Sequence, residues 1–200
     1  MPPPPLITVA GVDLYDVRSM YPPQEGGAVA RQRDPALLQA IAIHHDAVIM
    51  NTDIAGPDYS GQSLTQDSLR LGAIYRHAQD QGWGGFPYHF IASPSGRAFY
   101  TTDVSMFGAT VAGRNHQLLG VALMGNFMLS QPGDLQLCAA ARCIVATWGL
   151  TRRLVTYWGH RELALPAYPT SCPGDTWPQW SHKLLTYAAA LARRGGPPQP

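Results

Sequence analysis

Short apolar runs of strand length alternate with longer segments of helical periodicity along this 200-residue chain. Residues 40–45, 88–92, 98–102, 119–125 and 154–157 are predicted strands, because each run is short, rich in apolar residues and bounded by turn-forming or polar residues. Residues 119–125 are apolar almost throughout, as expected for a strand that is buried on both faces. This alternation indicates an α/β fold, in which helices cover the faces of a sheet.

Three segments have helical patterns. Ser63 and Gln66 have the spacing of a capping box, and apolar residues then recur every three or four positions until a glycine ends the pattern. The same periodicity predicts helices over residues 137–148 and 177–194. We therefore expect about three helices around the sheet.

The strands at residues 88–92 and 98–102 are separated only by segment 93–97, which contains both proline and glycine. A connection this short favours a β-hairpin. Since a hairpin adds an antiparallel pair to strands that helices otherwise connect in parallel, we predict a central mixed β-sheet.

The two ends differ from the middle in composition. Prolines at residues 2–5 and 22–23 and the glycine- and proline-rich last residues are typical of extended, polyproline-like segments. We therefore divide the chain into a proline-rich N-terminal extension over 1–30, a folded domain over 31–194 and a flexible tail over 195–200.

Composition excludes several classes of protein. Hydrophobic residues make up 46% of the chain and charged residues 14%, which argues against a disordered protein. The formal charge of +1 gives no basic surplus for binding nucleic acid. No apolar run approaches the roughly 20 residues that cross a bilayer. Three cysteines do not form a disulfide framework. An enzyme or a binding module remains.

Three clusters of chemically active residues follow predicted strands or occupy a loop. Residues 44–46 read His-His-Asp at the end of the first apolar run, and His160 follows the strand at 154–157. Cys172 lies in a loop punctuated by proline and glycine. In α/β sheets, functional groups collect beyond the carboxyl ends of the strands.

One histidine of the pair His44–His45, together with His160 and Cys172, makes a set of two imidazoles and one thiolate. Zn²⁺ takes such ligands, and three of them leave a fourth position for water, as in catalytic zinc sites. Because neighbours in a strand point to opposite faces, only one of His44 and His45 can face the site, and the period does not say which. Each residue taken alone is more often structural than metal-binding.

The joint pattern is more specific. Gly-His-Arg-Glu at residues 159–162 and Thr-Ser-Cys-Pro-Gly at 170–174 resemble the Gly-His-Arg-Asp and Thr-x-Cys-Pro-Gly motifs of the zinc-dependent type-2 N-acetylmuramoyl-L-alanine amidases. That family includes the peptidoglycan recognition proteins. Segments 41–45, 82–97 and 115–127 match further motifs in the family's order, so the resemblance covers most of the chain. It implies the peptidoglycan-recognition (amidase type 2) fold.

The resemblance also implies a Zn²⁺ cofactor and a set of site residues. The implied ligands are His44, His160 and Cys172. The implied catalytic residues are Tyr88, whose hydroxyl would orient the attacking water and stabilise the developing oxyanion, and Thr170, which would support the tetrahedral intermediate.

Further positions are candidates for binding substrate. Trp83 is expected to form the floor for a sugar ring or simply to pack at a helix end, and Asn115 to contact the substrate or to hold a turn. His45 is the histidine of the pair that the family does not use on the metal. Glu162 stands where the family has aspartate, and is either a proton carrier or a structural group. Thr110 replaces a histidine that many members carry, which puts the stem-peptide preference in question rather than catalysis.

The implied function is zinc-dependent hydrolysis of the amide bond between N-acetylmuramic acid and L-alanine in peptidoglycan. The alternative is a non-catalytic peptidoglycan-binding receptor or adaptor, but non-enzymatic members of the family typically lose the cysteine that is present here as Cys172. We expect a monomer that acts on glycan strands with stem peptides. No secretory signal is visible, which favours a phage-type lysin released from the cytoplasm over a tethered wall-remodelling module.

Overall fold

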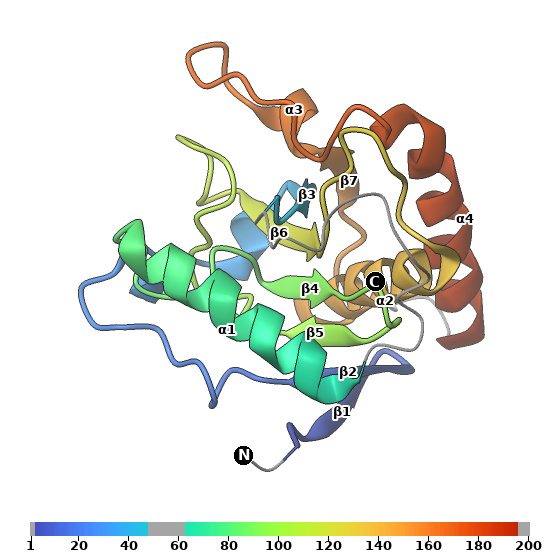
Figure 1. Cartoon of the computed structure of the whole chain (residues 1–200), viewed down its shortest axis with the longest axis horizontal. Helices are drawn as coiled ribbons and strands as arrows, with labels where there is room; N and C mark the ends of the chain where they lie inside the picture. Colours follow the sequence, from blue (N-terminus) through green and yellow to red (C-terminus); the bar gives the residue numbers. More distant parts are fainter. Residues whose placement is uncertain (1–2, 48–62, 196–200) are drawn as a thin grey trace.

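The computed structural model describes residues 3–47 and 63–195. Its centre is a seven-stranded sheet with the strand order β1-β2-β5-β4-β6-β3-β7. Helices lie on both faces of this sheet (Figure 1). Since the sheet contains both antiparallel and parallel pairs, the predicted α/β fold with a central mixed sheet is confirmed.

The strands that carry the candidate site lie together at one side of the sheet. β3 (Ala40–His45) pairs in parallel with β6 (Leu118–Leu123) on one side and with β7 (Thr156–Gly159) on the other. β3 and β6 are buried at every position. β4 (Phe90–Ala92) and β5 (Ala98–Tyr100) form the predicted antiparallel hairpin, and β4 pairs in parallel with β6.

The sheet extends into the segment that the sequence analysis assigned to the N-terminal extension. β1 (Leu6–Val9) and β2 (Val12–Asp16) form a hairpin, and β2 pairs in parallel with β5. Leu14 of β2 is fully buried. These strands join the sheet through a partner more than eighty residues away in sequence, which the surrounding prolines gave no means to anticipate. Residues 196–200 of the predicted tail lie outside the described residues.

The three long helices fall where the periodicity placed them, and a short fourth helix follows β7. Their bounds are α1 (Leu64–Asp80), α2 (Asp134–Thr151), α3 (His160–Leu163) and α4 (Trp177–Gly195). Two single-turn 3-10 helices cover Ala28–Ala30 and Pro35–Leu37. Within the described residues, no helix has both the length and the apolar character that a membrane span requires.

The predicted capping box begins α1. The Ser63 hydroxyl accepts the backbone N–H of Gln66, and the Gln66 side chain accepts the backbone N–H of Ser63. Both bonds use N–H groups that have no partner within the helix itself. Local sequence therefore fixes where this helix starts.

The sheet separates two apolar clusters. Leu71 and Ile74 of α1 pack on one face, while α2 and α4 cover the other face, where Trp180 and Leu184 are buried. Figure 1 shows α1 on the near side of the sheet and the α2–α4 pair on the opposite side. Successive strand residues point to opposite faces, so strands covered on both sides are apolar throughout.

The loop between β5 and β6 folds back over β6 at Gly120. A Cβ at this position would lie 2.3 Å from Cγ2 of Thr110, so the close approach requires glycine. The Asn115 side-chain oxygen accepts the backbone N–H groups of Thr110 and Val111, each at 2.8 Å. These contacts shape the loop, whose residues form one wall of a pocket.

Candidate metal centre

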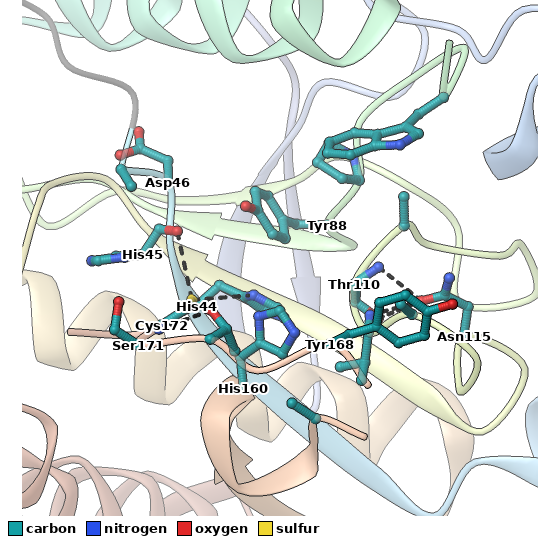
Figure 2. A pocket seen from close by; sticks show the side chains of 18 of the residues that line it. His44, His45, Asp46, Tyr88, Thr110, Asn115, His160, Tyr168, Ser171 and Cys172 are labelled. Carbon is teal, nitrogen blue, oxygen red and sulfur yellow. Dashed lines mark hydrogen bonds between the residues drawn. The ribbon is translucent and has the colours of Figure 1, made fainter. Parts of the chain in front are cut away.

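Two parallel strands bring His44 and His160 together. Ile43 of β3 pairs with Gly159 of β7, so the next residues, His44 near the end of β3 and His160 at the start of α3, lie next to each other at the carboxyl ends of the two strands. Their ring centroids are 4.5 Å apart. Figure 2 shows both rings beside Cys172. This is the carboxyl-end arrangement that the sequence predicted.

Cys172 reaches the two histidines from the loop that precedes α4. Its carbonyl accepts the backbone N–H of Arg161 at 2.8 Å, and its own N–H donates to the Thr170 hydroxyl at 3.1 Å. Its Sγ lies 3.5 Å from Nδ1 of His44, a residue 128 positions away in sequence. The main chain of Cys172 is therefore held by one bond to α3 and one bond within its own loop.

The three side chains fit a tetrahedral zinc ion. Their ligand atoms all lie within 4.8 Å of one another. Imidazole nitrogen and thiolate sulfur bound tetrahedrally to one Zn²⁺ are separated by about 3.6 Å, which matches the 3.5 Å between His44 and Cys172. Of the two residues left open by the strand period, it is His44, not His45, that joins this cluster.

The His44 ring is not satisfied by the protein groups around it. The residue is only 2% exposed, and its Nε2 is buried without a hydrogen-bond partner among the described residues. Because buried polar atoms nearly always have a partner, the unpartnered Nε2 shows that the surrounding protein does not complete this ring. The nitrogen that lies next to the Cys172 sulfur is the other one, Nδ1. The chemistry of the donor set, two imidazoles and a sulfur, suits Zn²⁺.

Burial sets the charge state of the cluster. It lowers the pKa of His44 well below the ordinary 6.5 and that of His160 to about 4, and it raises the pKa of the Cys172 thiol to about 12. At neutral pH without a cation, both rings are uncharged and the thiol keeps its proton. The imidazoles are then ready to bind a metal, and the thiol releases a proton when it does so.

Tyr88 and Thr170 line the same pocket as the three side chains. The Tyr88 ring centroid lies 5.0 Å from that of His44, and burial raises the pKa of its hydroxyl well above 10, so that the group keeps its proton. The Thr170 hydroxyl accepts the N–H of Cys172 and retains its own O–H for donation. The structure thus places two hydroxyl donors beside the cluster.

The pocket has a volume of about 700 Å³, and Trp83 and Asn115 line it together with the cluster. Figure 2 shows Thr110, Asn115 and Tyr168 on the side of the pocket away from Cys172. Trp83 is half-buried, and its ring meets the His77 ring edge-on. The side-chain oxygen of Asn115 binds two N–H groups of its own loop. This atom therefore holds a turn, which is one of the two roles expected for Asn115 from the sequence.

His45 also lines the pocket but has a partner inside the protein. Its Nδ1 accepts the backbone N–H of Phe127 at 3.2 Å, and the two rings are in contact, with centroids 6.2 Å apart. Burial lowers the pKa of His45 to about 4, which keeps the ring neutral. The ring thus anchors the loop after β6, whatever else it contacts.

Two features of the site had no assigned role in the sequence analysis. The Asp46 carboxylate forms a buried ion pair with Arg70 of α1, with two N–O distances of 2.9 Å, and also accepts the N–H of Gly125. This ties the residue after the histidine pair to α1, and nothing local in sequence links the two. Tyr168 lines the pocket with 58% of its surface exposed. The sequence feature that could have identified it is its position as an aromatic residue close to the cysteine motif.

Comparisons with known proteins support the resemblance. No protein-family model matches the chain. The human N-acetylmuramoyl-L-alanine amidase is 28% identical over 201 residues, which cover 90% of this chain and 33% of the human protein. The chain thus spans about a third of the length of this curated relative.

Solved structures share the fold. Bumblebee peptidoglycan recognition protein SA aligns with a TM-score of 0.62 at 20% identity, over 82% of this chain and 91% of that chain. An N-acetylmuramoyl-L-alanine amidase endolysin of Clostridium intestinale aligns with a TM-score of 0.56 at 18% identity, over 81% of this chain and 93% of that chain. Together these comparisons agree with what the motifs indicated: the chain is similar in sequence to N-acetylmuramoyl-L-alanine amidases and peptidoglycan recognition proteins, and it shares the fold of the solved structures.

Proposed function

We propose that this protein is a zinc-dependent N-acetylmuramoyl-L-alanine amidase, which hydrolyses the amide bond between the lactyl group of N-acetylmuramic acid and L-alanine in peptidoglycan. The observation that carries the proposal is a set of two imidazoles and a thiol, with His44 and Cys172 buried and His160 half-buried, whose ligand atoms lie within 4.8 Å of one another in the wall of a pocket. The name of the human relative supports the same reaction.

His44, His160 and Cys172 would hold the metal. Bound there, Zn²⁺ would lower the pKa of water to about 7 and polarise the carbonyl group of the substrate. His44 and Cys172 are buried and His160 is half-buried, which favours this because electrostatic interactions are screened less there than in open solvent.

Tyr88 and Thr170 would stabilise the transition state. Attack on an amide carbonyl places negative charge on the carbonyl oxygen, and hydroxyl donors aimed at that oxygen lower the barrier. Each donor of this kind is typically worth about 10²–10³ in rate. Both hydroxyls carry a proton available for such a bond.

The proton balance needs no further carboxylate. Water adds a hydroxyl group to the carbonyl carbon, the C–N bond breaks, and the leaving amine of L-alanine takes up the proton that the water has lost. Among the described residues that line the pocket, Asp46 is the one carboxylate, and it is paired with Arg70.

The substrate would lie in the pocket that the cluster lines together with Trp83 and Asn115. Aromatic side chains suit the apolar face of a sugar ring, and an amide side chain suits the polar groups of a glycan or peptide. We assign Trp83, Asn115 and His45 to this surface as substrate-binding candidates.

The test compares the parent protein with Cys172→Ala and with Cys138→Ala, a control that removes a half-buried thiol on α2 outside the pocket. Each protein, loaded with zinc, is incubated with purified peptidoglycan, and the soluble products are identified by mass spectrometry. The parent and Cys138→Ala are expected to release stem peptides with a free L-alanine amino terminus, and Cys172→Ala to release none.

The rival function predicts a different result. If the zinc-loaded parent and Cys172→Ala both sediment with peptidoglycan and neither releases peptide, the protein is a peptidoglycan-binding receptor or adaptor, and the amidase proposal is wrong.

A further inference from the structure

The four-residue helix α3 carries two charged side chains next to the ligand candidate His160. Arg161 and Glu162 follow His160 directly, yet neither is among the residues that line the pocket. Their contacts run instead to the elements on either side of α3. This raises the question of what they do for the metal centre.

Glu162 joins the end of β7 to the start of α4. Its Oε2 accepts the backbone N–H of Gly159 at 2.6 Å and the indole N–H of Trp177 at 3.2 Å. The packing between these groups is close, because a Cβ on Gly159 would lie 2.9 Å from the same indole nitrogen. One carboxylate oxygen therefore fixes the residue immediately before His160.

Arg161 makes the complementary connection to the cysteine loop. Its backbone N–H donates to the carbonyl of Cys172 at 2.8 Å. Its guanidinium group donates to the carbonyl of Ser171 and to the Asp175 carboxylate, the latter at 3.1 Å. The same turn that presents one ligand candidate is thus bonded to the segment that presents another.

We propose that Glu162 is a positioning residue for the metal centre, which fixes the turn bearing His160 against β7 and α4, and is not a proton carrier in the reaction. The inference rests on the proposed function, because it concerns the same metal centre. Its physical basis is that a three-ligand site binds tightly only if the ligands are already held at the correct separation. One of its two carboxylate oxygens already accepts two N–H groups, and Glu162 does not line the pocket in which the reaction would take place.

The test uses two variants of Glu162. Glu162→Gln keeps an oxygen that can accept both N–H groups but cannot carry a proton, whereas Glu162→Ala removes both bonds. Glu25→Ala, at an exposed glutamate outside the pocket, is the matched control. Zinc affinity is measured for the metal-free proteins by competition with a chromogenic chelator, and amidase kcat is measured at saturating zinc across a range of pH.

We expect Glu162→Ala to bind zinc about 10–100-fold more weakly than the parent, as is typical when a group that supports a metal ligand is lost. Glu162→Gln should stay within about 3-fold of the parent in zinc affinity and in kcat, with the same pH profile. Glu25→Ala should equal the parent. Circular dichroism of each metal-free variant establishes that it is folded.

Two results would overturn the proposal. Unchanged zinc affinity in folded Glu162→Ala would remove the positioning role, even if the parent is an active amidase. A fall of about 100-fold or more in kcat of Glu162→Gln, with one limb of the pH profile lost and zinc affinity intact, would identify a proton carrier. Failure of the amidase proposal can be distinguished from both results, because the parent protein itself would then release no peptide.

Discussion

Two buried histidines close to the centre of the sheet have opposite surroundings. His44, on β3, is 2% exposed and has one ring nitrogen without a partner among the described residues. His89, directly before β4, is fully buried, and both of its ring nitrogens are in contact with polar groups. Burial lowers the pKa of both rings well below 6.5. Burial and pKa therefore do not distinguish a metal ligand from a structural histidine.

The hydrogen bonds do distinguish them. Nδ1 of His89 accepts the N–H of Gly120 at 3.1 Å, and its Nε2 lies 3.0 Å from the carbonyl of Met106, with Arg33 beside it. Both nitrogens of the His89 ring thus have polar neighbours, whereas His44 has the Cys172 thiol beside Nδ1, no partner for Nε2 among the described residues, and a second imidazole close by. The polar atoms around each ring, and not its burial, separate the two histidines.

The largest expected effect is the loss of zinc binding when His44 is replaced. His44→Ala should weaken zinc binding by about 10³-fold or more and abolish amidase activity, because one of three protein ligands is lost. Competition with a chromogenic chelator measures the affinity, and peptide release from peptidoglycan measures the activity. Zinc binding by His44→Ala within 10-fold of the parent would contradict the assignment of His44 as a ligand.

Tyr88 adjoins His89 in sequence, but its ring contacts that of His44. Tyr88→Phe removes only the hydroxyl, so kcat is expected to fall about 10²–10³-fold while zinc affinity and folding stay as in the parent. Steady-state kinetics on a soluble muramoyl peptide test this. A variant with the kcat of the parent would exclude Tyr88 as an oxyanion donor.

His89→Ala is expected to act on stability alone. It leaves the buried N–H of Gly120 and the carbonyl of Met106 without their partner and opens a cavity, so the free energy of unfolding should fall by about 2–4 kcal/mol. Urea denaturation measures the loss, and chelator competition should give the zinc affinity of the parent. Weakened zinc binding in the folded variant would contradict a purely structural role for His89.

The pH dependence of stability tests the buried neutral rings. Because the folded-state pKa of His89 is lowered, the unfolded chain binds a proton below about pH 6.5 that the folded protein does not, so stability falls as the pH falls. Each such ring contributes a slope of up to about 1.4 kcal/mol per pH unit. Denaturation of the metal-free parent and of His89→Asn between pH 7 and pH 5 should give a shallower slope for the variant; equal slopes would argue against a neutral buried His89.

The smallest expected effect concerns the pocket wall far from both rings. Tyr168 is exposed at the pocket, so Tyr168→Ala is expected to raise KM for peptidoglycan fragments about 3–10-fold with little change in kcat, because it removes binding surface without touching the metal centre. Tyr168→Phe, which keeps the ring, should resemble the parent. A fall in kcat without a change in KM would place Tyr168 in the chemistry instead.

Much of the fold was predictable because its signals are local. The capping box at Ser63 and Gln66 starts α1 as expected, and the short segment between β4 and β5 makes the expected hairpin. β1 and β2 were not predicted as part of the sheet, since they depend on pairing with the distant β5. The Asp46–Arg70 ion pair was likewise out of reach, because its two members lie on different elements.

The site followed the same division. The residue types and their order along the chain, supported by the resemblance to a known family, were enough to nominate His44, His160 and Cys172. The partners of Glu162 could not be read from its position in the motif, because Trp177 lies on another helix.

By itself, the sequence determined which chemical groups this protein carries and where its helices and turns begin, since those signals act between residues a few positions apart. Only the tertiary structure decided that a thiol and an imidazole 128 residues apart lie 3.5 Å from each other. It also places His44, not His45, beside them, as the resemblance implied and as the strand period alone could not say. The reason is physical: the register between β3 and β7 and the path of the cysteine loop are set by the packing of the whole domain, and no local segment contains that information.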